Sequence, residues 1–105
     1  MARVLAVVAD LMLSSRVAEG LGVAGHQVEV VAVLPERVDA EVIVCDLDAV
    51  DAAAVAAAGP PSLGFYSHVD AETRASAQAA GIDVVVPRSR MARELPELVE
   101  RLLEA

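Results

Sequence analysis

The sequence has few aromatic, basic and cysteine side chains, and these shortages restrict its core, its partners and its compartment. Aromatic residues make up 2% of its 105 residues and hydrophobic residues 56%, so alanine, valine and leucine must fill the core. The formal net charge of −8 argues against nucleic acid or an anionic membrane as a partner, because both bind basic surfaces. The single cysteine, Cys45, cannot form an internal disulfide, which is typical of a reducing cytoplasm.

Long hydrophobic runs are also missing. A membrane-spanning helix needs about 18 or more consecutive apolar residues, and no run in this chain approaches that length. The N-terminal stretch MARVLAVVADLM resembles a signal peptide only as far as Asp10, and no small-residue cleavage pattern follows it. We therefore expect one soluble, cytoplasmic domain over residues 1–105.

Short apolar runs alternate with amphipathic segments along the chain. Apolar runs without polar alternation are typical of strands that are covered on both faces of a parallel sheet. We predict strands at 3–9, 26–34, 42–45, 62–67 and 83–87. We predict helices at 13–24, 71–80 and 95–103, an alanine-rich helix of about two turns at 51–58, and at most two helical turns over 35–39. This alternation predicts an α/β fold, a flavodoxin-like three-layer sandwich with a five-stranded parallel sheet in the order 2-1-3-4-5 and shortened second and third helices.

Several local features refine this prediction. Asp10, Ser14 or Ser15 is expected to cap the first helix, and Asp70 the helix at 71–80, with His68 and Val69 in the loop before it. The six residues GLGVAG at 20–25 spell GxGxxG, but they follow a helix and lead into a strand, whereas a dinucleotide site needs the reverse order. We interpret these glycines as a chain reversal, and His26 beside them as a surface residue. Residues 89–94 are expected to form a connector, with Pro96 in the first turn of the last helix.

Polar residues follow four of the five predicted strands. Asp10 ends the first strand, Asp46 and Asp48 end the third, Ser67 ends the fourth and Arg88 ends the fifth. In the predicted order, the first and third strands are neighbours, so Asp10 and Asp46 are expected to lie close together. Facing carboxylates repel each other unless a cation or a basic side chain joins them. Their oxygens suit Mg²⁺, and Arg88 could pair with Asp46 or with a phosphoryl group on it.

These segments resemble the receiver domain of response regulators over nearly the whole chain. VLAVVAD resembles the first strand of that family with its acidic pair, EVIVCDLDAVD resembles the third strand, and FYSHVDAETRASAQAAGIDVVVPRS resembles the stretch from the fourth to the fifth strand. The resemblance implies that Asp46 is the phosphoacceptor and that Ser67 and Arg88 support it. It also implies a Mg²⁺ site made by Asp10, Asp46 and the backbone carbonyl of Asp48.

The chain departs from the receiver pattern at several functional positions. Ala9 replaces the first residue of the acidic pair, which removes one metal ligand. Arg88 stands where the family has a lysine, and the hydroxyl position after the fourth strand aligns with Tyr66 or, slipped by one residue, with Ser67. The aromatic residue that receivers often carry on the fifth strand is absent from residues 84–86.

We therefore predict a standalone pseudo-receiver, a signalling or adaptor module without enzymatic activity, without a required cofactor and with little or no phosphotransfer. Its expected partner is another protein or a second copy of the chain. The predicted contact surface is the fourth helix, the fifth strand and the fifth helix, where Arg88, Arg90 and Arg93 gather positive charge.

Other functions stay open on the sequence. The main alternative is a Mg²⁺-dependent receiver that is phosphorylated on Asp46. A phosphatase of the haloacid dehalogenase type is a further one, because DLDAV resembles its DxDx(T/V) motif, but here that motif lies on the third strand and lacks the downstream acidic pair. A cofactor-binding flavodoxin-like domain is disfavoured because no loop after a strand is rich in Gly, Ser or Thr.

Overall fold

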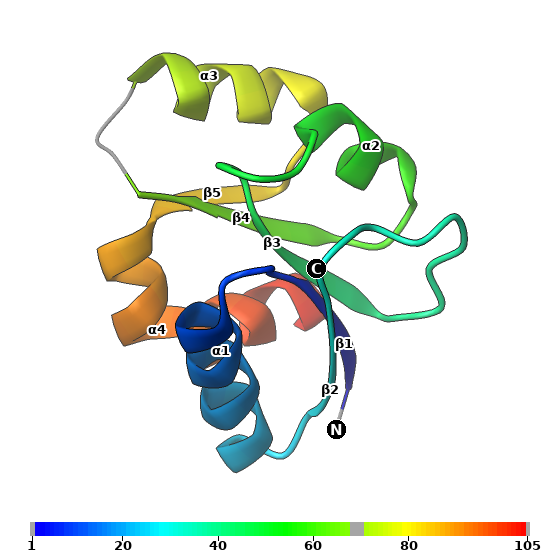
Figure 1. Cartoon of the computed structure of the whole chain (residues 1–105), viewed down its shortest axis with the longest axis vertical. Coiled ribbons are helices and arrows are strands. Elements are labelled where there is room, and N and C mark those ends of the chain that lie inside the picture. The colour runs from blue at the N-terminus through cyan, green and yellow to red at the C-terminus, as the bar shows by residue number, and fades with distance from the viewer. Residues whose placement is uncertain (1, 68–70, 105) are drawn as a thin grey trace.

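The computed structural model describes residues 2–67 and 71–104 and has the predicted α/β architecture. Its elements are β1 (Arg3–Val7), α1 (Leu11–Val23), β2 (Gln27–Val31), β3 (Val42–Asp46), α2 (Ala52–Ala57), β4 (Ser62–Tyr66), α3 (Ala71–Ala80), β5 (Val84–Pro87) and α4 (Arg88–Glu104). The strands pair in parallel in the order β2-β1-β3-β4-β5, which confirms the predicted topology. Figure 1 shows α1 and α4 on one face of the sheet and α2 and α3 on the other. None of the helices in the described ranges is long and apolar enough to cross a membrane.

The sheet separates two hydrophobic cores, because successive side chains of a strand point to opposite faces. In β1, Val4 and Ala6 join the core under α1 and α4, whereas Leu5 and Val7 join the core under α2 and α3. The two cores differ in what their helices contribute. The first takes three apolar side chains from α1 and five from α4, namely Leu13, Val17, Leu21, Met91, Leu95, Leu98, Val99 and Leu102. The second takes one buried side chain from α2 (Val55) and one from α3 (Ala77).

The connection between β2 and β3 forms no helix, so the predicted second helix is lost and not merely shortened. The connection, residues 32–41, is shorter than the dozen or more residues that a helical crossover between parallel strands usually takes. Leu34, Val38 and Ala40 instead pack directly against the second core. The third predicted helix is present as α2 and has six residues. The predicted fourth and fifth helices therefore correspond to α3 and α4.

The last helix begins earlier than predicted. Residues 89–94 are helical and not a connector, and Pro96 lies inside α4 and not in its first turn. Met91 explains the difference, because it joins Leu95 and Leu98 on one buried face of the helix. Burial of this longer face compensates for the hydrogen bond that a proline inside a helix removes, a loss of about 3 kcal/mol.

His26 is buried, at 8% exposure, and the prediction of a surface residue is wrong. Its Nδ1 accepts a hydrogen bond from the Ala2 N–H at 3.1 Å, so the ring proton is on Nε2, which donates to Glu100 Oε1 at 3.1 Å. His26 thus joins the start of β1 to the C-terminal part of α4. The chain reversal before it is confirmed, because Gly25 follows α1 with a φ of 95°, a conformation that favours glycine.

The predicted loop residues His68 and Val69 and the predicted cap Asp70 lie outside the described residues.

Candidate functional site

The residues predicted for the site meet at the edge of the sheet where the parallel strands end. Asp46 is the last residue of β3 and pairs in register with Phe65 of β4. The neighbouring strand on its other side is β1, which leads into Asp10. Ser67 follows β4, and Arg88 opens α4 directly after β5. The fold therefore brings together side chains that are far apart in the sequence.

Asp46 is the buried member of this group, at 9% exposure. Burial raises the pKa of its carboxyl above the ordinary value, while a hydrogen bond from the Asp48 N–H acts in the opposite direction. The negative charges of Asp48 and Asp10 raise the pKa further, and the positive charge of Arg88 lowers it. Asp48, Asp10 and Arg88 are therefore each within electrostatic reach of the Asp46 carboxylate.

Each of the three carboxylates also accepts a hydrogen bond from at least one backbone N–H group. Asp10 is the N-cap of α1, as predicted, since its Oδ1 accepts from Met12 N at 2.9 Å and Leu13 N at 3.0 Å. Asp46 Oδ1 accepts from Asp48 N at 3.0 Å, which shapes the turn after β3. Asp48 Oδ2 accepts from Ser67 N at 3.0 Å and so joins this turn to the end of β4. One oxygen of every carboxylate is therefore engaged in shaping the loops of the edge.

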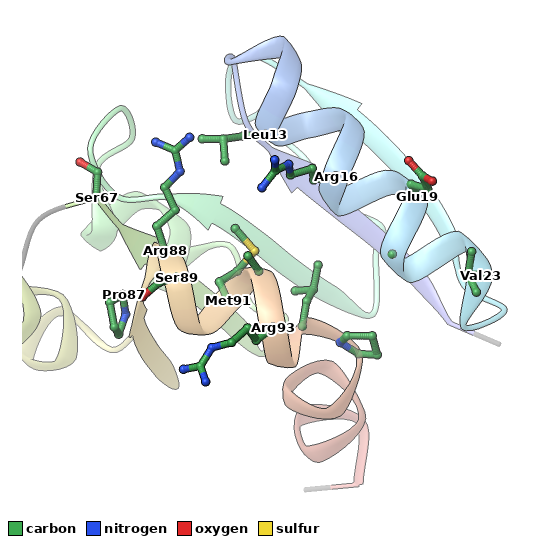
Figure 2. Close-up of a pocket in the computed structure, with 14 residues that line it drawn as sticks. Leu13, Arg16, Glu19, Val23, Ser67, Pro87, Arg88, Ser89, Met91 and Arg93 are labelled. Carbon is green, nitrogen blue, oxygen red and sulfur yellow. The ribbon is translucent and has the colours of Figure 1, made fainter.

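Arg88 is exposed and makes no hydrogen bond or ion pair within the described residues. Its guanidinium extends toward Leu13 at the mouth of a cavity between α1 and α4 (Figure 2). Arg93 also lines that cavity, whereas Arg90 pairs with Glu94 at 3.2 Å along α4. The three arginines predicted to form one positively charged face are therefore separated, because Arg88 and Arg93 line the cavity and Arg90 is paired with Glu94.

Comparison with known proteins identifies the fold. No protein-family model matches the chain, and a search of curated proteins found no match either. Solved structures do match. A CheY-like receiver domain from Methanospirillum hungatei JF-1 has a TM-score of 0.85 and 18% identity over 99% of this chain and 94% of its own. The receiver domain of the Francisella response regulator 1452 has a TM-score of 0.84 and 16% identity over 99% of this chain and 98% of its own.

The chain has the receiver-domain fold. A third match, the ChxR receiver domain from Chlamydia trachomatis, covers 100% of both chains at a TM-score of 0.74 and 17% identity. NtrX from Brucella abortus matches with a TM-score of 0.83 and 22% identity over 98% of this chain, which spans only 27% of NtrX. At these identities, the likeness establishes the architecture and not the activity.

A magnesium site in this receiver fold would draw on Asp10, Asp46 and Asp48, whose oxygens are of the type that the ion prefers. Ala9 offers no side-chain oxygen at the end of β1. Within 2–67 and 71–104, no group of three or more His, Cys, Asp or Glu side chains is placed to hold a metal ion. Magnesium binding at the receiver edge stays a prediction, and no step of the proposed function depends on it.

Leu47 and Gly64 belong to this site although the sequence reasoning did not select them. The Leu47 N–H donates to the Phe65 carbonyl at 2.8 Å, and the Leu47 side chain lies over Gly64 in β4. A Cβ at position 64 would lie 2.8 Å from Leu47 Cγ. An alanine at position 64 would have to displace the Leu47 side chain, so glycine lets the turn of residues 46–48 lie close to β4. A lone glycine inside an apolar strand is the sequence signal for such a close approach.

Proposed function

We propose that this protein is a pseudo-receiver, a non-enzymatic signalling or adaptor module that binds another protein and transfers little or no phosphoryl group. The supporting observation is the use of Asp10, Asp46 and Asp48 as backbone acceptors. Carboxylates that shape loops have less freedom to rearrange around a cation and a phosphoryl group. Ala9 removes a further ligand, and Arg88 is directed to a neighbouring cavity.

The proposed contact surface is formed by α3, β5 and α4. Receiver domains interact with other proteins and often dimerise. In this chain, β5 is an edge strand, so the backbone groups on its outer side are not paired within the sheet. The adjacent helix α3 buries only Ala77, which leaves most of its side chains open to a partner. The half-buried pair of Arg90 and Glu94 adds one charge of each sign to α4.

The absence of phosphotransfer can be tested by adding Mg²⁺ and beryllofluoride and recording amide NMR spectra. Beryllofluoride mimics an aspartyl phosphate and binds only where the carboxylate and a metal ion cooperate. We expect that beryllofluoride, added at a fixed Mg²⁺ concentration, causes no saturable shifts at Asp10, Asp46 or Arg88. The variant Asp46→Asn is the control. Shifts at these positions that disappear in Asp46→Asn would contradict the proposal and establish the phosphorylatable receiver instead.

The contact surface can be tested by photo-crosslinking in cells that express the protein. A photoreactive amino acid replaces Gln78, which is exposed on α3, or Gln27, which is exposed on the opposite edge strand β2. We expect a discrete protein adduct, or a crosslinked dimer, from position 78 and none from position 27. Equal adducts at both positions, or an adduct at position 27 alone, would refute the assignment of this surface.

A further inference from the structure

A cavity of about 780 Å³ opens between α1 and α4. Its volume falls within the roughly 300–1,000 Å³ of typical small-molecule sites. Its apolar wall comes from both helices and includes Leu13, Val23, Met91, Leu95 and Pro96. Val23 is 86% exposed although it is apolar. The cavity thus presents hydrophobic surface to water (Figure 2). The two helices that form it lie on the face of the sheet away from α2 and α3 (Figure 1).

Two arginines from different helices extend into this cavity. Figure 2 shows Arg16 of α1 and Arg88 of α4 reaching into the space between the helices, whereas the carboxylate of Glu19 is directed away from α4. Within the described residues neither arginine makes a hydrogen bond or an ion pair, although the protein has 16 acidic side chains and a net charge of −8. Both cations line the same cavity, and an anion bound between them would offset their mutual repulsion.

We propose that this cavity binds an amphiphilic carboxylate, with its head group between Arg16 and Arg88 and its apolar chain along α1 toward Val23. The planar guanidinium fork matches the two oxygens of a carboxylate. Val23 lies ten positions after Leu13, so the helix wall is about 15 Å long, because each residue adds about 1.5 Å. An alkyl chain of that length would cover the exposed Val23 side chain at the far end of the cavity. This ligand site goes beyond the adaptor role and does not depend on it.

The charged end of the site is tested by titrating decanoate, kept below its micelle concentration, and following amide NMR shifts. We expect saturable shifts at residues that line the cavity. Arg16→Gln and Arg88→Gln should each weaken decanoate about tenfold or more, as a charge-assisted hydrogen bond is removed. Arg74→Gln, which makes the same change on α3, is the matched control and should bind like the parent. Decanol, which has the same chain without the charge, should bind at least about tenfold more weakly.

The apolar part of the site is tested by closing the cavity. A Cβ at Gly20, which lines the cavity, meets no heavy atom within 4 Å, and the same is true of Gly22, which does not line it. Gly20→Phe should therefore fold and abolish decanoate binding, whereas Gly22→Phe should leave it intact. Dispersed amide spectra verify that both variants are folded.

Three results would overturn the proposal. The first is the lack of any saturable shift at residues lining the cavity. The second is equal binding of decanol and decanoate. The third is unchanged decanoate affinity in both Arg88→Gln and Gly20→Phe.

Discussion

Replacing Gly64 by alanine tests how closely the acidic loop lies against β4. The new Cβ would lie 2.8 Å from Leu47 Cγ and Cδ1 and 2.9 Å from Cδ2. All three carbons are close, so a small rotation of the side chain end does not relieve the contact. The Leu47 backbone is held by its 2.8 Å hydrogen bond to the Phe65 carbonyl. Either the leucine must leave its position or the loop must move away from the sheet.

The expected destabilisation follows from two opposing contributions. Overpacking of a core position costs about 1–3 kcal/mol. Removing a glycine from a strand lowers the entropy of the unfolded chain and returns about 0.5–1 kcal/mol. We therefore expect Gly64→Ala to lower the free energy of unfolding by about 1–2 kcal/mol. The disturbance should also reach Asp46, Asp48 and, through its bonded amide, Ser67.

Urea unfolding followed by circular dichroism measures this loss, and amide NMR shifts locate it. The control is Gly22→Ala, where the new Cβ has no neighbour within 4 Å and the helix should gain about 0.5–1 kcal/mol. The double variant Leu47→Ala with Gly64→Ala should lose less stability than the sum of the two single variants, because the clash needs both side chains. A Gly64→Ala variant that is as stable as the parent and leaves the amides of residues 46–48 unshifted would contradict the close packing of Leu47 on β4.

Three further predictions concern buried polar groups. Burial raises the pKa of Asp46, so the folded state holds its proton more tightly than the unfolded state, and the contribution of this group to stability falls as pH rises through the folded-state pKa. Asp46→Asn keeps an oxygen acceptor for the Asp48 N–H, so urea unfolding at neutral pH should show that the variant is more stable than the parent. This gain should disappear below the ordinary aspartate pKa of 3.8. An equal gain at both pH values contradicts the prediction. His26→Ala should lower the free energy of unfolding by about 1–3 kcal/mol, because the Ala2 N–H loses its acceptor in a buried site; unchanged urea unfolding contradicts this. Burial raises the pKa of the Cys45 thiol to about 12, and the Asp46 charge adds a smaller effect. Iodoacetamide should therefore modify Cys45 only after denaturation. Rapid modification of the folded protein, detected by mass spectrometry, contradicts this.

The strand order and the location of the candidate site could be predicted because they depend on local patterns. Apolar runs such as residues 42–45 are recognisable without knowledge of their neighbours, and the alternation of strands and helices restricts the topology to few choices. Once the order is known, Asp10, Asp46 and Arg88 must end at one edge of the sheet. The capping role of Asp10 is also local, since the acceptor and its donors are two and three residues apart.

The remaining features depend on contacts between distant residues. The burial of His26 follows from partners 24 and 74 positions away, and nothing in the sequence around it signals them. The polar composition of residues 89–94 gives no sign of a helix, because only Met91 faces the core there. The hydrogen bonds of the carboxylates to backbone N–H groups and the direction of Arg88 depend on the conformation of the loops. The sequence therefore located the edge of the sheet but not the partners of its charged side chains.

The two helical layers of this sheet differ in their resistance to local opening. The layer of α2 and α3 is anchored by one buried side chain in each helix, whereas α4 buries five. Segments with few buried contacts open with a smaller free energy than the whole domain, and their amide hydrogens exchange sooner with solvent. The α3 layer can therefore rearrange while β1, β3 and α4 keep their native structure. We therefore expect two cooperative units that share a single sheet, with the one containing α2 and α3 opening at a lower free energy than the one containing α4.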